Sequence, residues 1–213
     1  MTFYFKNIAN TLTIIRIIIA PFFFLLFLNQ KYIFALILFI FASITDALDG
    51  FFARKLEIVS KFGSIYDPLA DKILTLFAFT CIFMNPPFIL INQPLNEHSF
   101  YLFNLPLMII ISRDIVITFF RNKLSKSDII LKASLMGKLK TFFQLIFIII
   151  FLAEKALINS NLERYILNIG VIELDIAISL VLGFTFILML YLALLFSIIG
   201  FVSYTIKNIK YIK

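Results

Sequence analysis

The sequence predicts an all-α integral membrane protein with six transmembrane helices, and two observations lead to this prediction. Of the 213 residues, 62% are hydrophobic and only 15% are charged, and the mean hydropathy is +1.04. An ordinary soluble domain is less apolar and more highly charged. In addition, six apolar runs are long enough, at about 20 residues each, to cross a bilayer core. They use most of the chain, so a single membrane domain over residues 1–213 is expected.

The six predicted helices follow one another along the chain. They cover residues 11–28, 32–52, 66–84, 101–120, 138–154 and 176–203. The first run contains Arg16 and Pro21, is too long for a signal-peptide core and is not followed by a small-residue cleavage site, so we expect it to be retained. Pro68 fits the first turn of the third helix, where no backbone donor is lost. Cys81 is the only cysteine, so neither a disulfide nor a zinc site is expected.

The placement of lysine and arginine predicts the orientation of these helices. Basic residues gather at both termini and in the connections after the second and fourth runs. By contrast, residues 85–100 contain no Lys or Arg, and residues 154–175 contain two basic and four acidic residues. The positive-inside rule therefore places both termini on the cytoplasmic side of the cell (inner) membrane. This use of the positive charge predicts contact with membrane lipids, and no nucleic-acid partner is expected.

Two aspartates lie at the end of the second predicted helix, on a face with little bulk. Two acidic and two small residues fall within a stripe about 100° wide: Asp46, Asp49, Gly50 and Ala53. A carboxylate at mid-bilayer costs about 2.5–3.5 kcal/mol on insertion scales, so acids within membranes usually face a cavity that has a function. The small residues leave room for a bulky ligand. Arg54, at the edge of the stripe, supplies a cation suited to phosphate oxygens.

A second pair of aspartates, Asp67 and Asp71, lies one helical turn apart at the start of the third predicted helix. The short connection folds this pair back towards the first, so four carboxylates are expected to converge at the cytoplasmic surface. They repel one another unless some protonate or bind cations. Mg²⁺ or Mn²⁺ fits such an all-oxygen site, with two ions about 3.5–4 Å apart. Calcium fits as well, whereas zinc is disfavoured because no cysteine or histidine can join the site.

The expected substrate is a lipid that contains a pyrophosphate, because metals and Arg54 neutralise phosphate charge while the helices hold acyl chains. Positioning and charge neutralisation then supply most of the catalysis. The only histidine, His98, lies in an outward connection, which excludes Ser-His-Asp hydrolases and phospholipase-D-type enzymes. The alternative from another class is a cation carrier. It explains buried carboxylates but not the small residues and arginine at fixed gaps, and carriers bind their ions near mid-bilayer.

Eight residue identities at fixed gaps form one motif around these aspartates. The motif reads Asp46-x-x-Asp49-Gly50-x-x-Ala53-Arg54, eight residues, then Gly63-x-x-x-Asp67-x-x-x-Asp71. It resembles the signature of the CDP-alcohol phosphatidyltransferases. The resemblance implies a six-helix membrane enzyme, commonly a homodimer, which moves a phosphatidyl group from CDP-diacylglycerol to an alcohol and releases CMP. It also implies that the four aspartates hold two divalent ions and that Asp71 is the catalytic base. Four further positions would line the CDP site: Gly50, Ala53, Arg54 and Gly63.

Three further stretches point to the acceptor alcohol. Residues 7–21, 112–121 and 132–144 are similar to the branch of this family that makes phosphatidylglycerophosphate from glycerol 3-phosphate, although Ala9 and Asp114 replace the more usual proline and glutamate. Four cations at cytoplasmic helix ends are candidates for the acceptor phosphate: Arg113, Arg121, Lys138 and Lys140. Positive-inside anchoring alone would also place them there. The nearest alternative is a cardiolipin-forming member of the family that uses phosphatidylglycerol.

Overall fold

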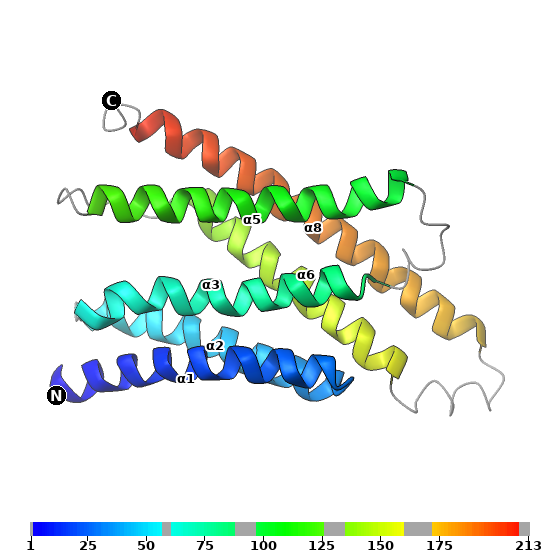
Figure 1. Ribbon diagram of the computed structural model, residues 1–213, viewed down its shortest axis with the longest axis horizontal. Coiled ribbons are helices and arrows are strands. Elements are labelled where there is room, and N and C mark those ends of the chain that lie inside the picture. The colour runs from blue at the N-terminus through cyan, green and yellow to red at the C-terminus, as the bar shows by residue number, and fades with distance from the viewer. Residues whose placement is uncertain (1, 57–60, 88–96, 126–134, 160–171, 209–213) are drawn as a thin grey trace. The chain divides into compact units, whose positions relative to one another are not determined.

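The computed structural model describes residues 2–56, 61–87, 97–125, 135–159 and 172–208. Within these ranges it describes the side chains of residues 14–45, 72–87, 101–120, 135–159, 178 and 180–206. The described residues form six helices and contain no strand (Figure 1). In chain order the helices are α1 (Thr2–Leu28), α2 (Tyr32–Leu56), α3 (Lys61–Met84), α5 (Glu97–Ser125), α6 (Leu135–Asn159) and α8 (Ile172–Asn208). The all-α prediction is therefore confirmed.

Each of the six predicted helices is present, and most extend beyond the apolar run that predicted them. The largest difference is in α1, which begins at Thr2, nine residues before the predicted start, and α3 begins at Lys61, five residues before its predicted start. The expectation that Pro68 lies in the first turn, with Asp67 and Asp71 at the start of the helix, was therefore wrong. Asp67 and Asp71 are the seventh and eleventh residues of α3. In a membrane the chain keeps its backbone hydrogen bonds within helices wherever it can, and a proline is then tolerated inside a helix.

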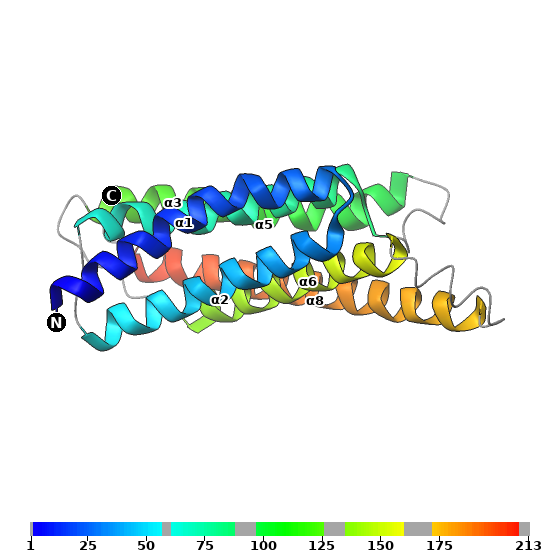
Figure 2. The same ribbon diagram turned by 90° about the horizontal axis from the view of Figure 1, so that it is seen from below.

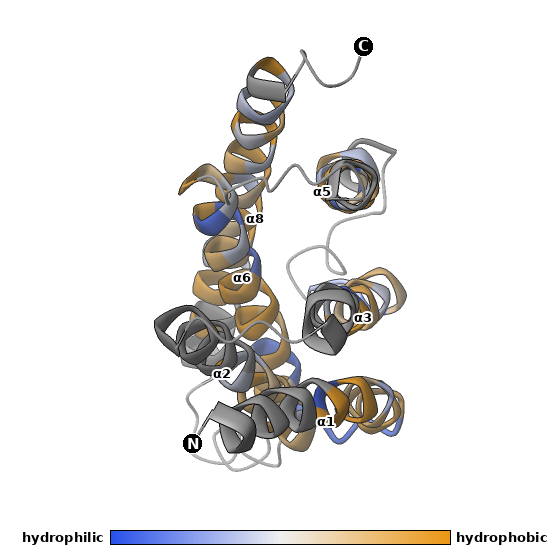
Figure 3. Ribbon diagram, turned by 90° about the vertical axis from the view of Figure 1, so that its left-hand side faces the viewer, coloured by the Kyte–Doolittle hydropathy of each residue, from blue (hydrophilic) through white to orange (hydrophobic). Residues whose placement is uncertain are grey.

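Apolar residues, coloured orange in Figure 3, make up much of the described helices. Among the described residues, three stretches are long and apolar enough to cross a membrane: Tyr101–Phe120, Leu135–Asn159 and Leu180–Ile206. Many large apolar side chains in these stretches are exposed, including Phe119 at 68% and Phe184 at 64%. Such exposure is expected where side chains face lipid. The chain is therefore a membrane protein, and spans formed by α1, α2 and α3 stay a prediction.

Contacts divide the chain into two compact units, and the first comprises Met1–Pro86 with Phe151–Asp175. In this unit α1 packs against both α2 and α3, running antiparallel to α2 and parallel to α3 (Figure 2). Aromatic rings fill the contacts: the ring centroids of Phe23 and Phe39 are 5.5 Å apart, and those of Phe24 and Phe77 are 5.1 Å apart. Phe27 adds a contact with Phe151 of α6 at 5.8 Å.

A tight turn at the end of α1 fixes the antiparallel pairing with α2. Gln30 has a positive φ of 59°. The amide of Gln30 donates to the Phe27 carbonyl, and the amide of Lys31 donates to the Leu26 carbonyl. This pair of bonds is the Schellman motif, which closes a helix at a residue in the left-handed region. The Asn29 side chain donates to one further carbonyl, that of Leu25, at 2.8 Å. Only three residues therefore separate α1 from α2.

The second unit comprises Pro87–Ile150 and Ile176–Lys213, and its helices are α5, α8 and the larger part of α6. Phe186 of α8 contacts both Phe103 of α5 and Phe147 of α6, with 5.7 Å between ring centroids in each case. The rings of Phe143 and Phe196 stack nearly parallel at 5.3 Å. These contacts fix the three helices of the unit against each other. The prediction of a single domain over residues 1–213 stays a prediction.

Candidate active site

The eight motif positions lie on two helices of the first unit. Asp46, Asp49, Gly50, Ala53 and Arg54 belong to α2, whereas Gly63, Asp67 and Asp71 belong to α3. Their side chains lie outside the described part of the chain, so the predicted metal and CDP sites stay predictions. Among the side chains that are described, no three His, Cys, Asp or Glu residues gather as metal ligands. The described residues thus offer no competing metal site.

A stripe of buried residues runs along each helix of this three-helix group. On α2 the stripe consists of Ala35, Phe39 and Ala42, all 0% exposed. On α3 it includes Leu74, Ala78 and Cys81, which are at most 3% exposed. The residues of each stripe are three or four positions apart, the spacing of one helical face. These faces are the inner faces of α2 and α3.

The buried stripe of α1 contains a charged residue. It begins at Arg16, which is 1% exposed, and continues through Ala20, Phe23 and Phe27. Arg16 is the largest fully buried side chain of the described residues. A charge inside an apolar run is expensive and usually marks a functional position. Sequence reasoning noted Arg16 but gave it no role, although its position within an apolar run was a usable signal.

In the second unit, one buried carboxylate holds two of the four cations predicted for the acceptor. Lys140 Nζ donates to Asp114 Oδ2 at 2.5 Å, and Arg113 Nη1 donates to Asp114 Oδ1 at 3.2 Å. Asp114 is 6% exposed and Lys140 is 2% exposed. We call Arg113, Asp114 and Lys140 the α5–α6 charge cluster. It contains two cations and one anion, and both the carboxylate and Lys140 are buried.

Three buried polar atoms near this cluster have no hydrogen-bond partner among the described residues. They are Nε of Arg113, Oε1 of Gln144 and Oγ of Ser197. Gln144 lies one helical turn after Lys140 on α6, and Ser197 lies one turn before Gly200 on α8. Buried polar groups are rarely left unpaired in native proteins, and ordered water or a ligand often completes them. Sequence reasoning missed Gln144 and Ser197, because polar residues in apolar helices are also common as lipid-shielded packing residues.

Arg113 approaches the backbone of α8 at a glycine. A Cβ atom at Gly200 would lie 3.0 Å from Arg113 Nη2 and 3.8 Å from the backbone nitrogen of Gly137. The absence of a side chain at this position lets the guanidinium lie directly against the helix. Gly200 thereby sets the place of Arg113, a role that the sequence alone did not indicate.

The other two predicted acceptor residues are not in the α5–α6 charge cluster. The side chain of Lys138 is exposed, and two residues of helix rotate it about 200° away from Lys140. The side chain of Arg121 lies outside the described residues. The structure therefore brings together Arg113 and Lys140 but leaves Lys138 apart from them.

The first unit carries a different polar cluster, which lies at the start of α2 and at the ends of α3 and α6. Nζ of the buried Lys155 donates to Asn85 Oδ1 at 3.1 Å and to the Pro86 carbonyl at 2.6 Å. It also lies 5.7 Å from the ring centroid of Phe151. Asn85 in turn donates to the Tyr32 hydroxyl at 3.5 Å. The hydrogen-bond partners of this lysine are neutral oxygens, and the buried carboxylate of the neighbouring Glu154 lies close enough to act on it electrostatically.

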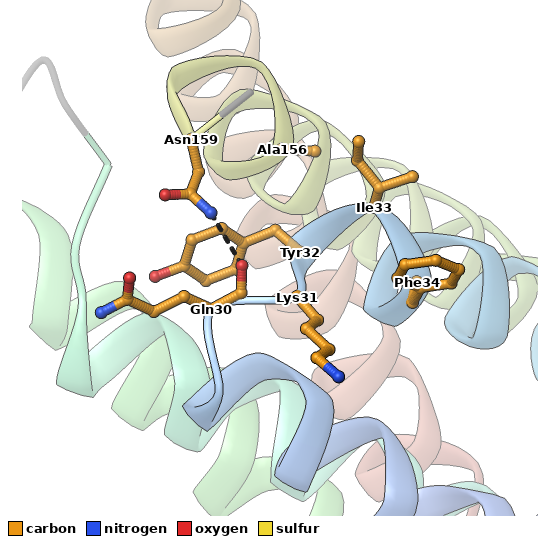
Figure 4. Close-up of a pocket in the computed structure, with 7 residues that line it drawn as sticks. All are labelled: Gln30, Lys31, Tyr32, Ile33, Phe34, Ala156 and Asn159. Atoms are coloured by element: carbon orange, nitrogen blue, oxygen red, sulfur yellow. Dashed lines mark hydrogen bonds between the residues drawn. The ribbon is translucent and has the colours of Figure 1, made fainter. Parts of the chain in front are cut away.

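A small pocket of about 160 Å³ lies near this second cluster (Figure 4). Its walls come from the α1–α2 turn, the start of α2 and the end of α6, where the Asn159 side chain donates to the Gln30 carbonyl at 2.8 Å. Tyr32 lines the pocket, and Asp46 is 14 residues further along α2. At a rise of 1.5 Å per residue, this separation is about 21 Å. The pocket is therefore not part of the predicted metal site.

Comparison with known proteins agrees with the motif. The sequence model of the CDP-alcohol phosphatidyltransferase family matches residues 6–206. Similar proteins carry the name CDP-diacylglycerol--glycerol-3-phosphate 3-phosphatidyltransferase. One from Wigglesworthia glossinidia brevipalpis is 34% identical over 176 residues, which cover 80% of this chain and 86% of the relative. One from Rickettsia typhi is 35% identical over 143 residues, covering 66% of this chain and 72% of the relative. One from Bacillus subtilis is 32% identical over 171 residues, covering 73% and 78%.

The matched region spans nearly the whole chain and includes all eight motif positions on α2 and α3. The all-helical fold and the apolar surface agree with the expectation that followed from the motif. The chain belongs to the CDP-alcohol phosphatidyltransferase family.

Proposed function

We propose that this protein transfers the phosphatidyl group of CDP-diacylglycerol to glycerol 3-phosphate, with phosphatidylglycerophosphate and CMP as products. The complete eight-position motif in a member of this family is the observation that carries the proposal. The names of the similar proteins, which specify glycerol 3-phosphate as the acceptor, support this choice of alcohol. The enzyme would be a transferase of phospholipid biosynthesis.

The donor set of the motif fits divalent metal ions. Asp46, Asp49, Asp67 and Asp71 supply only carboxylate oxygens, which are ligands for hard cations such as Mg²⁺ or Mn²⁺. The described inner faces of α2 and α3 support convergence, because both helices pack on α1 and each stripe, continued at its own spacing, reaches the aspartates. When bound, two such ions neutralise the charge of the pyrophosphate. Gly50, Ala53, Arg54 and Gly63 would line the site for the CDP group.

The residues of the chain then have distinct roles in one displacement. Asp71 accepts the proton of the 1-hydroxyl of glycerol 3-phosphate as that oxygen attacks the β-phosphorus of CDP-diacylglycerol. A bond forms between this oxygen and the β-phosphorus, and the bond from the β-phosphorus to the bridging oxygen breaks. The bridging oxygen leaves with the electron pair as part of CMP. Arg54 offsets the charge that develops on the pyrophosphate.

The α5–α6 charge cluster supports a phosphorylated acceptor. Lys140 is buried, so its charge is little screened by water. Among the described residues the cluster has two cations and one carboxylate, and the phosphate of glycerol 3-phosphate would add negative charge beside the second cation. Nε of Arg113, which has no hydrogen-bond partner in the described part of the chain, is a further donor for that phosphate. Arg121 and Lys138 would help to attract the phosphate from the cytoplasmic side.

The distribution of Lys and Arg supports an active site on the cytoplasmic side of the cell membrane. The motif further predicts a homodimer. Its mass in detergent, measured by light scattering with the detergent contribution subtracted, tests this assembly.

An acceptor screen with purified protein tests the proposed function. CDP-diacylglycerol, Mg²⁺ and one alcohol at a time are supplied, and CMP release is measured together with the lipid product. Glycerol 3-phosphate is expected to give phosphatidylglycerophosphate, and the Asp71→Asn variant is expected to release no CMP above background. Reaction with phosphatidylglycerol instead would reassign the protein to the cardiolipin-forming branch. A protein that releases no CMP with any alcohol would contradict the transferase proposal.

A further inference from the structure

Arg16 is buried, and an unbalanced charge is costly in a buried position. Its side chain is 1% exposed, and it lies in α1, which ends at Leu28. The residues that share its stripe, Ala20 and Phe23, are fully buried and apolar. Removing one partner of a buried ion pair is strongly destabilising, which shows how much a buried charge needs an opposite charge.

Two ring contacts fix which residues of α2 and α3 lie level with Arg16. Phe23 contacts Phe39 across the antiparallel pair of α1 and α2. Arg16 lies seven residues before Phe23, and Asp46 lies seven residues after Phe39. Both steps lead about 10.5 Å along their helices in the same direction. Arg16 and the backbone of Asp46 are therefore at the same level.

The parallel pair of α1 and α3 leads to the same level. Phe24 contacts Phe77. Arg16 lies eight residues before Phe24, and Leu69 lies eight residues before Phe77. Leu69 is midway between Asp67 and Asp71 in α3. Two independent contacts therefore place Arg16 at the level of three motif aspartates.

The faces agree as well as the levels. The stripe of α2, Ala35, Phe39 and Ala42, has alternating steps of four and three residues, and the next two steps of this pattern reach Asp46 and Asp49. On α3, steps of three and four residues lead from Cys81 back through Ala78 to Leu74. The next two steps of this pattern reach Asp71 and then Asp67. Steps of this kind stay on one face of a helix. The aspartate positions thus continue the faces that α2 and α3 bury, and Arg16 begins the face that α1 buries.

We propose that Arg16 is the internal counter-charge of the aspartate cluster, a positioning residue that holds the carboxylates together before metal binds. This inference rests on the metal site of the proposed function. Four carboxylates that converge repel one another, and a buried guanidinium between the helices offsets part of that repulsion. Its planar fork can hold two carboxylate oxygens at once. Divalent ions supply the same compensation, so Arg16 and the metals partly replace each other.

Because Arg16 and the metal ions offset the same repulsion, removal of Arg16 should change how strongly metal stabilises the protein. An arginine with only a packing role would not have this effect. Without Arg16, the metal-free protein keeps the full repulsion, and metal binding then relieves more of it. Arg16→Met should therefore lower Tm strongly in EDTA and less in Mg²⁺. The metal-induced rise in Tm is expected to be about twice that of the unchanged protein, because stabilisation by a ligand depends on its affinity for the folded state. Mn²⁺ titration in the absence of lipid should likewise show tighter binding.

Two further variants separate charge from size and position. Arg16→Lys keeps the positive charge and should keep the metal-induced rise close to that of the unchanged protein. Lys155→Met removes a buried cation from the same unit at a place away from the motif, where Lys155 contacts Asn85, 14 residues beyond Asp71. It should lower Tm equally in EDTA and in Mg²⁺. All four proteins are compared by thermal unfolding in one detergent, without substrate.

The outcomes distinguish this inference from the proposed function. If the unchanged protein shows no metal-induced rise in Tm and no metal-dependent CMP release, the proposed metal site itself is wrong. If the unchanged protein shows the rise and Arg16→Met shows an equal or smaller one, the counter-charge role alone is wrong. An equal rise combined with a higher KM for CDP-diacylglycerol would mean that Arg16 binds the substrate instead.

A double variant keeps the test decisive if Arg16→Met does not fold. Asp46→Asn removes one negative charge, so Arg16→Met with Asp46→Asn should be recovered as folded protein at a higher yield than Arg16→Met alone. Where all three can be purified, the loss of Tm in EDTA should be less than additive. Failure of the double variant to recover any folded protein would also overturn the inference.

Discussion

Lys140 and Lys155 are the same residue type on the same helix, and both are buried, yet they are held in opposite ways. Lys140 is paired with the carboxylate of Asp114, next to Arg113. Lys155 has a backbone carbonyl, an amide oxygen and an aromatic ring around it. The two lysines are 15 residues apart on α6, or about 22 Å. If Lys140 serves binding, as proposed, and Lys155 serves packing, burial alone does not distinguish the two roles.

The nature of the partners makes this distinction. Two neutral oxygens accept from Lys155, and together with Asn85 and Tyr32 this lysine joins the ends of three helices, which is a structural task. The described part of the α5–α6 charge cluster has two cations and one carboxylate and, beside it, buried polar atoms without hydrogen-bond partners among the described residues. We propose that such a cluster binds an anion. The difference can be tested by changing each element of the two clusters in turn.

Loss of the shared carboxylate should have the largest effect. Asp114→Asn leaves Lys140 and Arg113 without a counter-charge, and removal of one partner of a buried pair typically costs about 3–5 kcal/mol. We expect a fall in Tm and a loss of CMP release of at least about 100-fold, because the cations no longer keep their positions. Asp114→Glu should restore much of both. Full activity of a folded Asp114→Asn enzyme would contradict the role of the cluster.

The cation of the cluster should affect the acceptor selectively. Lys140→Met keeps most of the side-chain volume and removes the charge, so KM for glycerol 3-phosphate should rise about tenfold, the value of one charge-assisted hydrogen bond. KM for CDP-diacylglycerol should stay unchanged. The exposed neighbour Lys138 provides the matched comparison, and Lys138→Ala should raise the same KM by a smaller factor. An equal or larger effect of Lys138→Ala would mean that the exposed lysine, rather than the buried one, binds the phosphate.

A methyl group behind Arg113 should have a moderate effect. In Gly200→Ala the new Cβ would lie 3.0 Å from Arg113 Nη2, so the guanidinium must shift. We expect KM for glycerol 3-phosphate to rise about threefold with little change in Tm, since the end of a flexible side chain can move by a few tenths of an ångström. Steady-state kinetics at saturating CDP-diacylglycerol measures this change. A lower KM would show that Arg113 does not need to lie against α8.

Replacement of Lys155 should have the smallest effect on activity. Lys155→Met leaves Asn85 Oδ1 and the Pro86 carbonyl without their donor, which is expected to cost about 1–3 kcal/mol of stability. Both KM values and kcat should stay within error at a temperature well below Tm. A selective rise in either KM would abolish the distinction between the two lysines.

Sequence reasoning predicted the helices well because apolar length is a direct consequence of the bilayer. The predicted runs fell short at their polar ends, since a helix continues into the headgroup region after its apolar residues end. The start of α3 was misplaced for this reason, and Pro68 was given too much weight as a start signal. The separation of Lys138 from Lys140 was predictable in principle, because residues two apart on a helix face opposite sides.

The contacts between helices could not be predicted from the sequence alone. Asp114 and Lys140 are 26 residues apart on different helices, and nothing in their local pattern pairs them. The closeness of Gly200 to Arg113 depends in the same way on the packing of α8 against α5. For Arg16 the sequence showed a charge in an apolar run, but its role required the levels that the ring contacts of Phe23 and Phe24 provide.

The turn at Gln30 has a practical consequence for handling this protein outside its membrane. A left-handed backbone costs a side-chain-bearing residue about 1–2 kcal/mol more than it costs glycine. The hydrogen bond that Asn159 makes here uses the backbone carbonyl of Gln30, so a glycine would keep it. Gln30→Gly is therefore a rational first change for obtaining a protein that is more stable in detergent. Gln30 lies just before the start of α2, whereas the α2 residues assigned to chemistry lie near the other end of that helix.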